Sequence, residues 1–229
     1  MTTQVVARSS GRLSGRHRAR RRVQPWPLLV LYMRARQLGW FALGLTVVAL
    51  VGWWAAQALL YGDFEPDPDR RVPVAVAAPL LATVLASIGM GGADEELEHT
   101  TAWRWREARA GHIVAVTLLA ALALASIGTW EPENYGAQVI VRNVLGCFGV
   151  VAFATVIFGA RLAWAPLFGY VATVYLTAPK PPTNATAWWT WPIQPASSSV
   201  AWWTALTLFV LGTALYAVVG ARVTNTRDE

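Results

Sequence analysis

The stretch that decides the fold is residues 91–111, which read GGADEELEHTTAWRWREARAG. This stretch is densely charged, whereas the runs on either side of it, residues 72–90 and 112–130, contain no Asp, Glu, Lys or Arg. Each apolar run has the length of a helix that crosses ~30 Å of hydrocarbon, roughly 17 to 25 residues. The sequence therefore predicts two membrane spans joined by a charged loop, and that loop is the best place for a partner protein to dock.

The composition is that of a membrane protein. Of the 229 residues, 55% are hydrophobic and 14% are charged, whereas about a quarter of the residues in a typical soluble domain are charged. Many of the 13 Trp residues lie near the ends of apolar runs, where amphipathic rings favour the headgroup layer. The single cysteine, Cys147, excludes an intrachain disulfide and a two-cysteine redox motif.

Six apolar runs have spanning length, which predicts an all-α membrane protein with six transmembrane helices. A short helix in the cytosolic interface suits residues 27–36, PLLVLYMRAR, although an extension of the first span fits them equally well. We expect a disordered basic cytosolic tail (1–24), one six-helix transmembrane domain (25–222) and a cytosolic C-terminal tail (223–229). The predicted spans are 38–61, 72–90, 112–130, 139–159, 162–178 and 200–220, and Pro166 interrupts the fifth near its start.

The distribution of basic residues predicts the orientation. With both termini inside, the inner segments hold most of the 19 Lys and Arg residues, as the positive-inside rule requires. The outer segments hold only Arg70, Arg71 and Lys180, with Arg142 just inside the outer end of the fourth span. The basic N-terminal tail lies beside a span, so contact with anionic lipid explains its charge better than contact with nucleic acid.

Several kinds of chemistry lack their residues. No glycine-rich phosphate loop ends in Gly-Lys-Ser/Thr, so the chain is not expected to hydrolyse nucleotide itself. The three histidines, His17, His99 and His112, lack metal-ligand spacing, and no metal site is expected. No predicted span has an acidic residue at its centre, which argues against a proton- or sodium-driven carrier. No Ser/His/Asp or paired-Asp arrangement falls within the spans, so we do not expect an enzyme.

The charged loop has the features of a short docking helix. Asp94 suits an N-cap, Glu95 and Glu96 suit the positive end of a helix, and Gly111 suits its stop. Aromatic side chains would fill a pocket of the partner, and the charges would set the register. The alternative is a solvated loop at the membrane surface. The candidate docking residues are Asp94, Glu95, Glu96, Glu98, Thr100, Thr101, Trp103, Arg104 and Arg106.

This order of elements resembles the ABC-2 type permeases, the membrane subunits of ABC exporters. The resemblance is carried by two spans, then Glu96–Thr101 (ELEHTT), then Trp and Arg residues and a third span, and it covers most of residues 25–222. At His99-Thr100-Thr101 the sequence departs from the Gly-Thr often found in that family. The resemblance implies a type V exporter-like fold in the cell membrane, with the loop acting as the coupling helix in a groove of a separate ATP-binding subunit.

The resemblance also implies the partners and the cargo. ATP and Mg would be bound by the partner subunit, and this chain would hold no cofactor. A second copy or a related permease would complete a dimer along spans one and five. The cargo is expected to be amphipathic, a peptide, an antibiotic or a lipid, because the walls are apolar and rich in Trp and no buried charge is expected, and the family's precedent agrees. The rival hypothesis is a non-transporting membrane protein, an immunity or assembly scaffold that binds its partner through the same loop.

The outer segment between spans five and six, residues 179–199, reads PKPPTNATAWWTWPIQPASSS. Its five prolines preclude a regular helix throughout. In ABC-2 exporters this position forms short re-entrant helices that close the external mouth, so the resemblance implies that Trp188, Trp189 and Trp191 form an external gate. The alternative is a surface loop anchored by its tryptophans.

Three polar residues within the spans are candidates for a transport pathway. Arg142 either snorkels outward, pairs with Glu131 or Glu133, or contacts an anionic substrate, and Asn143 follows it. Gln57 either bonds a neighbouring helix or contacts substrate. Near them in span four, Gly146, Cys147 and Gly149 form a strip of small residues suited to close helix packing.

Overall fold

The computed structural model describes residues 36–61, 72–91, 105–126, 136–179 and 183–222. Within these ranges the chain is all-helical and contains no strand. The predicted tail of residues 1–24 and the tail of residues 223–229 lie outside the described residues. So does the predicted interfacial helix of residues 27–36, except for Arg36, which is a buried turn residue. The α-helices are α2 (Leu38–Tyr61), α3 (Val72–Met90), α5 (Trp105–Ala125), α6 (Ala137–Phe158), α7 (Trp164–Thr177) and α8 (Ser199–Val219), with short 3-10 helices η3 (Asn184–Thr186) and η4 (Trp191–Ile193).

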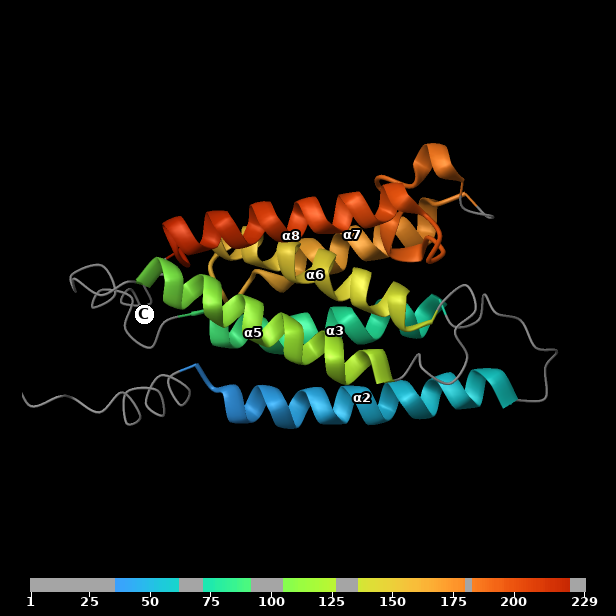
Figure 1. The fold of residues 1–229 in the computed structure, drawn as a ribbon, viewed down its shortest axis with the longest axis horizontal. Coiled ribbons are helices and arrows are strands. Elements are labelled where there is room, and N and C mark those ends of the chain that lie inside the picture. Colours follow the sequence, from blue (N-terminus) through green and yellow to red (C-terminus); the bar gives the residue numbers. More distant parts are fainter. Residues whose placement is uncertain (1–35, 62–71, 92–104, 127–135, 180–182, 223–229) are drawn as a thin grey trace, which may run out of the picture.

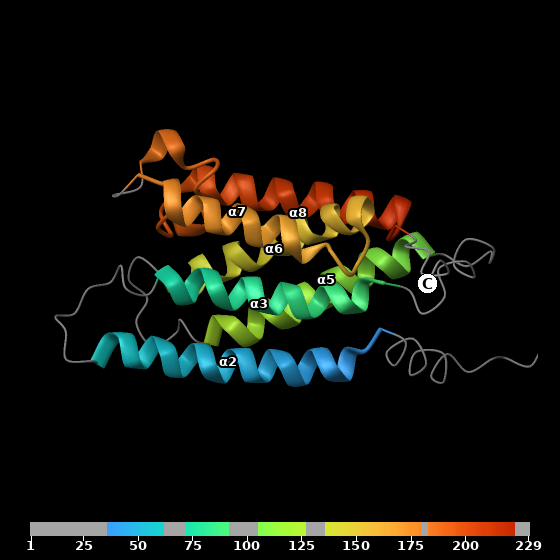
Figure 2. The same cartoon turned by 180° about the vertical axis from the view of Figure 1, so that it is seen from behind.

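The helices form an elongated antiparallel bundle. Helices α2, α5 and α7 run in one direction, and α3, α6 and α8 run in the other (Figures 1 and 2). One end of the bundle therefore holds the start of α2, the end of α3, the start of α5 and the end of α8. We call this the Arg36 end. The opposite end carries η3 and η4, and residues 183–198, which include both, are called the cap segment.

Helix α6 is the centre of the bundle and packs against α3, α5, α7 and α8. Its closest neighbour is α8, because two glycines face each other where the helices cross. A Cβ atom at Gly212 would lie 2.0 Å from the carbonyl oxygen of Gly149, and one at Gly149 would lie 2.4 Å from the backbone of Leu208. Of the predicted strip of small residues, Gly149 is confirmed at this crossing, since only glycine allows the two backbones to touch.

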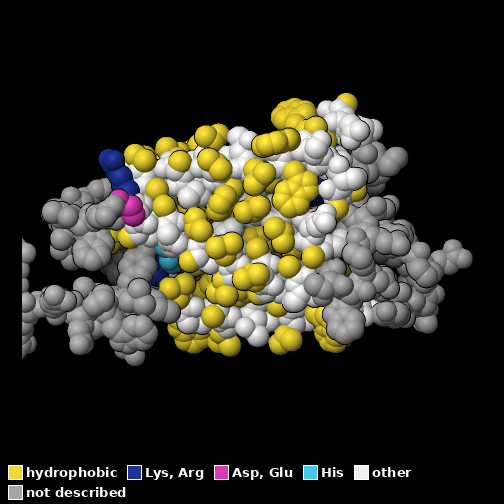
Figure 3. Space-filling view, in the orientation of Figure 1, with side chains coloured by type: hydrophobic (Ala, Val, Ile, Leu, Met, Phe, Trp, Pro, Cys, Tyr) yellow, Lys and Arg dark blue, Asp and Glu magenta, His cyan; other side chains and the backbone are white. Residues whose placement is uncertain are grey.

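The outer surface of the bundle is apolar. Figure 3 shows hydrophobic side chains over most of the length of the visible face, with charged side chains near the end where α5 begins. On α2 even large side chains such as Trp40, Leu50 and Trp54 are exposed. Five helices (α2, α3, α5, α6 and α8) are long and apolar enough to cross a membrane. Such a surface suits a lipid environment, and these features are those of a multi-pass, all-α membrane protein.

Two sequence predictions need correction. The predicted fifth span, residues 162–178, is helix α7, which has 14 residues and a length of about 21 Å, short of the hydrocarbon thickness. Spanning length is therefore confirmed for five of the six predicted helices. The third span was expected to begin at His112, after a stop at Gly111, but α5 begins at Trp105 and runs through Gly111. The segment Trp-Arg-Glu-Ala-Arg-Ala is made largely of good helix formers, and one exposed glycine does not end it.

Candidate functional site

The predicted docking residues are described only in part. Asp94, Glu95, Glu96, Glu98, Thr100, Thr101, Trp103 and Arg104 lie outside the described residues. Arg106 lies in the first turn of α5 with its side chain exposed. The described helices that flank this loop are α3, which ends at Met90, and α5, which begins at Trp105, and both termini lie at the Arg36 end (Figure 1).

A buried arginine binds the last turn of α3. Arg36 is only 4% exposed, and its Nη1 donates to the carbonyl oxygens of Gly89 (3.2 Å) and Met90 (3.0 Å) and to the hydroxyl oxygen of Tyr216 (3.2 Å). The Tyr216 hydroxyl in turn donates to the Met90 carbonyl at 2.6 Å. These carbonyls have no partner within their own helix and lie at the negative end of its dipole. Arg36 thus joins the start of α2, the end of α3 and α8.

Two further arginines meet helix C-termini at the same end. Arg222 donates from Nη1 to the carbonyl oxygen of Ile157 at 2.9 Å, near the end of α6. The guanidinium of Arg109 lies against Gly220, the residue that ends α8, where a Cβ atom would lie 2.7 Å from Cζ. Gly220 has φ 86°, a left-handed backbone that favours glycine. The ends of α3, α6 and α8 therefore each meet a cation, as their dipoles favour.

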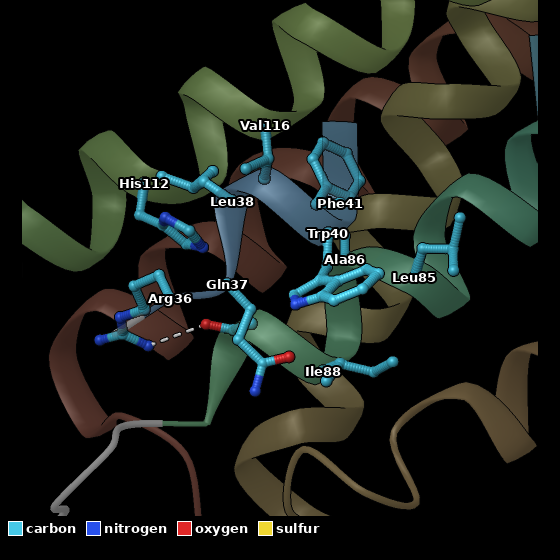
Figure 4. Close-up of a pocket in the computed structure, with 11 residues that line it drawn as sticks. Arg36, Gln37, Leu38, Trp40, Phe41, Leu85, Ala86, Ile88, His112 and Val116 are labelled. Carbon is cyan, nitrogen blue, oxygen red and sulfur yellow. Dashed lines mark hydrogen bonds between the residues drawn. The ribbon is translucent and has the colours of Figure 1, made fainter. Parts of the chain in front are cut away.

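A small pocket opens beside Arg36, between α2, α3 and α5. Figure 4 shows Arg36 and His112 on one side of it and Trp40, Leu85 and Ile88 on the other. Its volume is about 50 Å³, whereas the pockets that hold drug-sized ligands have roughly 300 to 1,000 Å³. It has room for a few water molecules, so it is not a binding site for an amphipathic cargo.

At the opposite end, the cap segment folds back onto the bundle. Trp191 is 1% exposed, and its ring lies on Gly146 of α6, where a Cβ atom would come within 2.4 Å of Cη2. The same ring stacks on Tyr170 of α7, with 6.3 Å between the ring centroids and 21° between the planes. The Tyr170 hydroxyl donates to the Trp189 carbonyl. Gly146 therefore leaves space for an indole ring, where the sequence had predicted close packing of helices.

The three tryptophans predicted to form a gate differ in their positions. Trp191 is inserted into the bundle, Trp189 is half-buried, and Trp188 is 64% exposed. The structure thus brings only one of the three together with the residues predicted to line a pathway. The cap segment is also tied to α8, because Trp202 donates from Nε1 to the Ala196 carbonyl at 3.2 Å.

Arg142 and Asn143 of α6 bind the cap segment through side-chain hydrogen bonds. Arg142 is 0% exposed and donates to the carbonyl oxygens of Gln194 at 2.7 Å and Pro195 at 3.0 Å. The predicted outward snorkelling of Arg142 is therefore wrong, because the cap segment brings carbonyl groups down to the guanidinium. The predicted alternative partners, Glu131 and Glu133, lie outside the described residues.

Asn143 links the cap segment to α3. Its Nδ2 donates to the Pro192 carbonyl at 2.8 Å and to the Ala75 carbonyl at 2.9 Å, and its Oδ1 accepts from Arg142. The Ala75 carbonyl needs this donor, since the residue four positions later is Pro79, which has no N–H. Pro79 was the signal in the sequence for this contact, because a proline inside a span leaves a carbonyl for another helix to satisfy.

Gln57, the third predicted pathway residue, lies apart from this group. It is half-buried on α2, and its side-chain amide makes no hydrogen bond to another described residue, so neither predicted role is supported there. Inside the cap segment, by contrast, Gln194 is buried and donates from Nε2 to the Thr190 hydroxyl at 2.8 Å. Within the described ranges no group of three His, Cys, Asp or Glu residues is placed to hold a metal ion.

Comparisons with family models, with curated proteins and with solved structures found no match to this chain. The geometry therefore carries the functional argument. It offers a buried arginine near each end of the bundle: Arg36 joins helices to helices, and Arg142 joins α6 to the folded-back cap segment.

Proposed function

We propose that this chain is the membrane subunit of an ATP-driven exporter of the ABC-2 type, with the type V exporter-like fold, six spans of which the 14-residue α7 is a shortened one, and both termini on the cytoplasmic side of the cell membrane. The loop of residues 92–104 would dock a separate ATP-binding subunit, which would hold the ATP and Mg. A second copy or a related permease would complete the particle along α2 and α7. Large apolar side chains of α2, such as Trp40, Leu50 and Trp54, are exposed, and the second subunit would cover them.

The contacts of Arg36 with the end of α3 and with Tyr216 are the observation that carries the proposal. The docking loop connects the end of α3 to the start of α5, and Arg36 binds that end of α3 while touching Tyr216 of α8. Arg109, on the first turns of α5, meets the end of α8 at Gly220. A force applied to the loop would therefore act on α3, α5 and α8 together, and on the start of α2. This is the connection that a bundle without its own nucleotide site needs.

The proposed cycle follows from these contacts. ATP binding would close a pair of partner subunits and move the loop, and the bundle would change between inward- and outward-facing arrangements. The cargo would be amphipathic (a peptide, an antibiotic or a lipid), since the outer surface of the bundle is apolar and two buried arginines, Arg36 and Arg142, lie near its two ends.

Copurification followed by uncoupling variants would test the proposal. The tagged chain is expected to copurify with an ATP-binding subunit whose ATP hydrolysis is stimulated by cargo. Glu98→Ala and Trp103→Ala should keep the assembled particle but lose that stimulation, because the charges and the aromatic anchor transmit the motion. Arg161→Ala is the matched control, since Arg161 is exposed and does not belong to the docking loop.

Two outcomes would contradict the proposal. Cargo-stimulated hydrolysis that persists in both loop variants would remove the loop from its coupling role. A stable partner that does not hydrolyse ATP would instead favour the rival function, a membrane immunity or assembly scaffold.

A further inference from the structure

Helix α2 is the least buried of the five helices that are long and apolar enough to span. It lies at the edge of the bundle and packs against α3 and α5 (Figures 1 and 2). Only 17% of its most apolar stretch is buried, compared with 67% for α6. Its buried side chains, such as Phe41, Leu45 and Ala56, share one side of the helix. The rest of α2 is left for lipid or for another protein to cover.

The exposed side of α2 carries a regular series of side chains. Successive members are separated by three and then four residues, which is the a and d spacing of a heptad. Such a seam keeps facing a second helix when both helices bend into a left-handed supercoil. Five members are large, apolar and exposed, and the sixth is a glutamine. We call these residues the α2 seam: Trp40, Leu43, Val47, Leu50, Trp54 and Gln57.

Gln57 is the member of the α2 seam that an apolar environment does not satisfy. It lies within Leu38–Leu59, the part of α2 that is apolar enough to cross a membrane. It is half-buried, and its amide makes no hydrogen bond to another described residue. An amide in hydrocarbon is costly without a partner, and glutamines in membrane spans bond across to a neighbouring helix. We therefore expect the partner of Gln57 to come from outside the described bundle.

Anchoring in the headgroup layers does not explain the two tryptophans of the α2 seam. Tryptophan rings favour those layers, and Trp40 and Trp54 lie toward opposite ends of the helix. They are 14 residues apart, which is about 21 Å along a helix, whereas the hydrocarbon is ~30 Å thick. The helix therefore places at least one of the two residues within the hydrocarbon. Packing against a second helix accounts for rings at both positions.

We propose that α2 of a second copy of this chain covers the α2 seam, and that the two Gln57 amides hydrogen-bond to each other. The proposal rests on the proposed function, in which it selects an identical copy over a related permease. Two copies inserted in the same orientation are related by a two-fold axis along the membrane normal, so their α2 helices run parallel and each seam residue near the axis meets its own counterpart. An amide both donates and accepts, so Gln57 is complementary to itself.

Cysteine crosslinking of the chain in membranes would test the position of the seam. The single native cysteine, Cys147, is buried and is replaced by Ala in the background. Under mild oxidation, Val47→Cys and Leu50→Cys should each form a disulfide-linked dimer, because residues that meet across a two-fold axis bring their Cβ atoms close together. Leu122→Cys on α5 is the control for random collision, since Leu122 is also exposed but lies on another helix.

The dissociation constant of the dimer would test the role of the amide. It is measured by single-molecule photobleaching of the labelled chain alone, diluted in phosphatidylcholine liposomes. Gln57→Leu should raise the dissociation constant about tenfold, because an interhelical hydrogen bond of this kind in a membrane has about that effect. Gln57→Asn keeps an amide and should dimerise more tightly than Gln57→Leu. Leu122→Ala, which trims an exposed side chain outside the seam, should dimerise like the unaltered chain.

Two results would overturn the proposal: no more crosslinked dimer from Val47→Cys and Leu50→Cys than from Leu122→Cys, or equally tight dimers of Gln57→Leu and the unaltered chain. The first result would mean that lipid or an unlike protein covers α2. Because no ATP-binding subunit takes part, a monomeric chain would leave the exporter proposal standing, with a related permease as the second subunit. Loss of coupling in the assembled particle would equally leave a positive dimer result intact.

Discussion

Arg36 and Arg142 are both buried, both donate to main-chain carbonyls, and lie at opposite ends of the same bundle. Arg36 binds the last turn of a helix, where the carbonyls are unpaired and the dipole is negative. Arg142 binds a segment built from 3-10 turns and prolines, which folds back from beyond α7. The same chemistry thus joins helices to one another at one end and holds a loop in place at the other.

This difference separates the two ends in how they would move. At the Arg36 end the partners are long helices, so a displacement there moves the bundle. At the cap end the partner is a short segment that packs on the bundle with Trp191 and Ile193 and makes a few hydrogen bonds to it. Its opening would leave the long helices folded. Local opening of this kind has a lower free energy than global unfolding.

The largest expected effect comes from the crossing of α6 and α8, where Gly149 faces Gly212. Gly212→Val would place a Cβ atom 2.0 Å from the Gly149 carbonyl oxygen, and backbone cannot rotate away as a side chain would. We expect a loss of about 3 kcal/mol or more and little monodisperse protein. Thermal unfolding of the purified chain measures the loss. Gly169→Val on α7 is the control, because a Cβ atom there meets nothing within 4 Å; equal behaviour of the two variants would contradict the close crossing.

Arg36→Met should have the next largest effect, since it leaves the Gly89 carbonyl without its donor and removes one of two donors to Met90. The expected loss is about 2 kcal/mol, and Tyr216→Phe should cost about 1 kcal/mol. The double variant should lose less than the sum, because the bond between Arg36 and the Tyr216 hydroxyl is already lost in either single variant. Strict additivity in thermal unfolding would show that the two side chains act independently.

Asn143→Ala sharpens the comparison at the cap end. It should cost about 1 to 2 kcal/mol, because the Ala75 and Pro192 carbonyls lose their donor. Adding Pro79→Ala should recover part of the loss, since the new N–H can bond the Ala75 carbonyl within α3. Absence of any recovery in thermal unfolding would show that Asn143 does not act by satisfying that carbonyl.

Trp188→Ala should have the smallest effect. Its ring is 64% exposed, so the unfolding free energy is expected to change by no more than about 0.5 kcal/mol. Trp191→Ala, measured beside it, should lose clearly more, because its ring is buried on Gly146. If Trp188→Ala and Trp191→Ala lost similar unfolding free energy, the two rings would not differ in burial, which would contradict the positions described for them.

The helices followed from the sequence more closely than the site did. The bounds of α2 and α3 are those predicted, because the apolar runs end at charged or turn-forming segments. Helix α5 begins earlier than predicted because local helix propensity continues through charged residues. Arg142 was predicted to reach outward because its position near a span end suggests access to water. Its acceptors come from residues 194 and 195, and no local pattern indicates that this distant segment folds back.

Hydrogen exchange of the cap segment in the particle assembled with the ATP-binding subunit would test the central claim most directly. A non-hydrolysable ATP analogue is expected to change the exchange of residues 183–198, because motion of the docking loop reaches the far end through α3 and α8. The change should vanish in Glu98→Ala. Exchange that is the same with and without nucleotide would contradict coupling between the two ends.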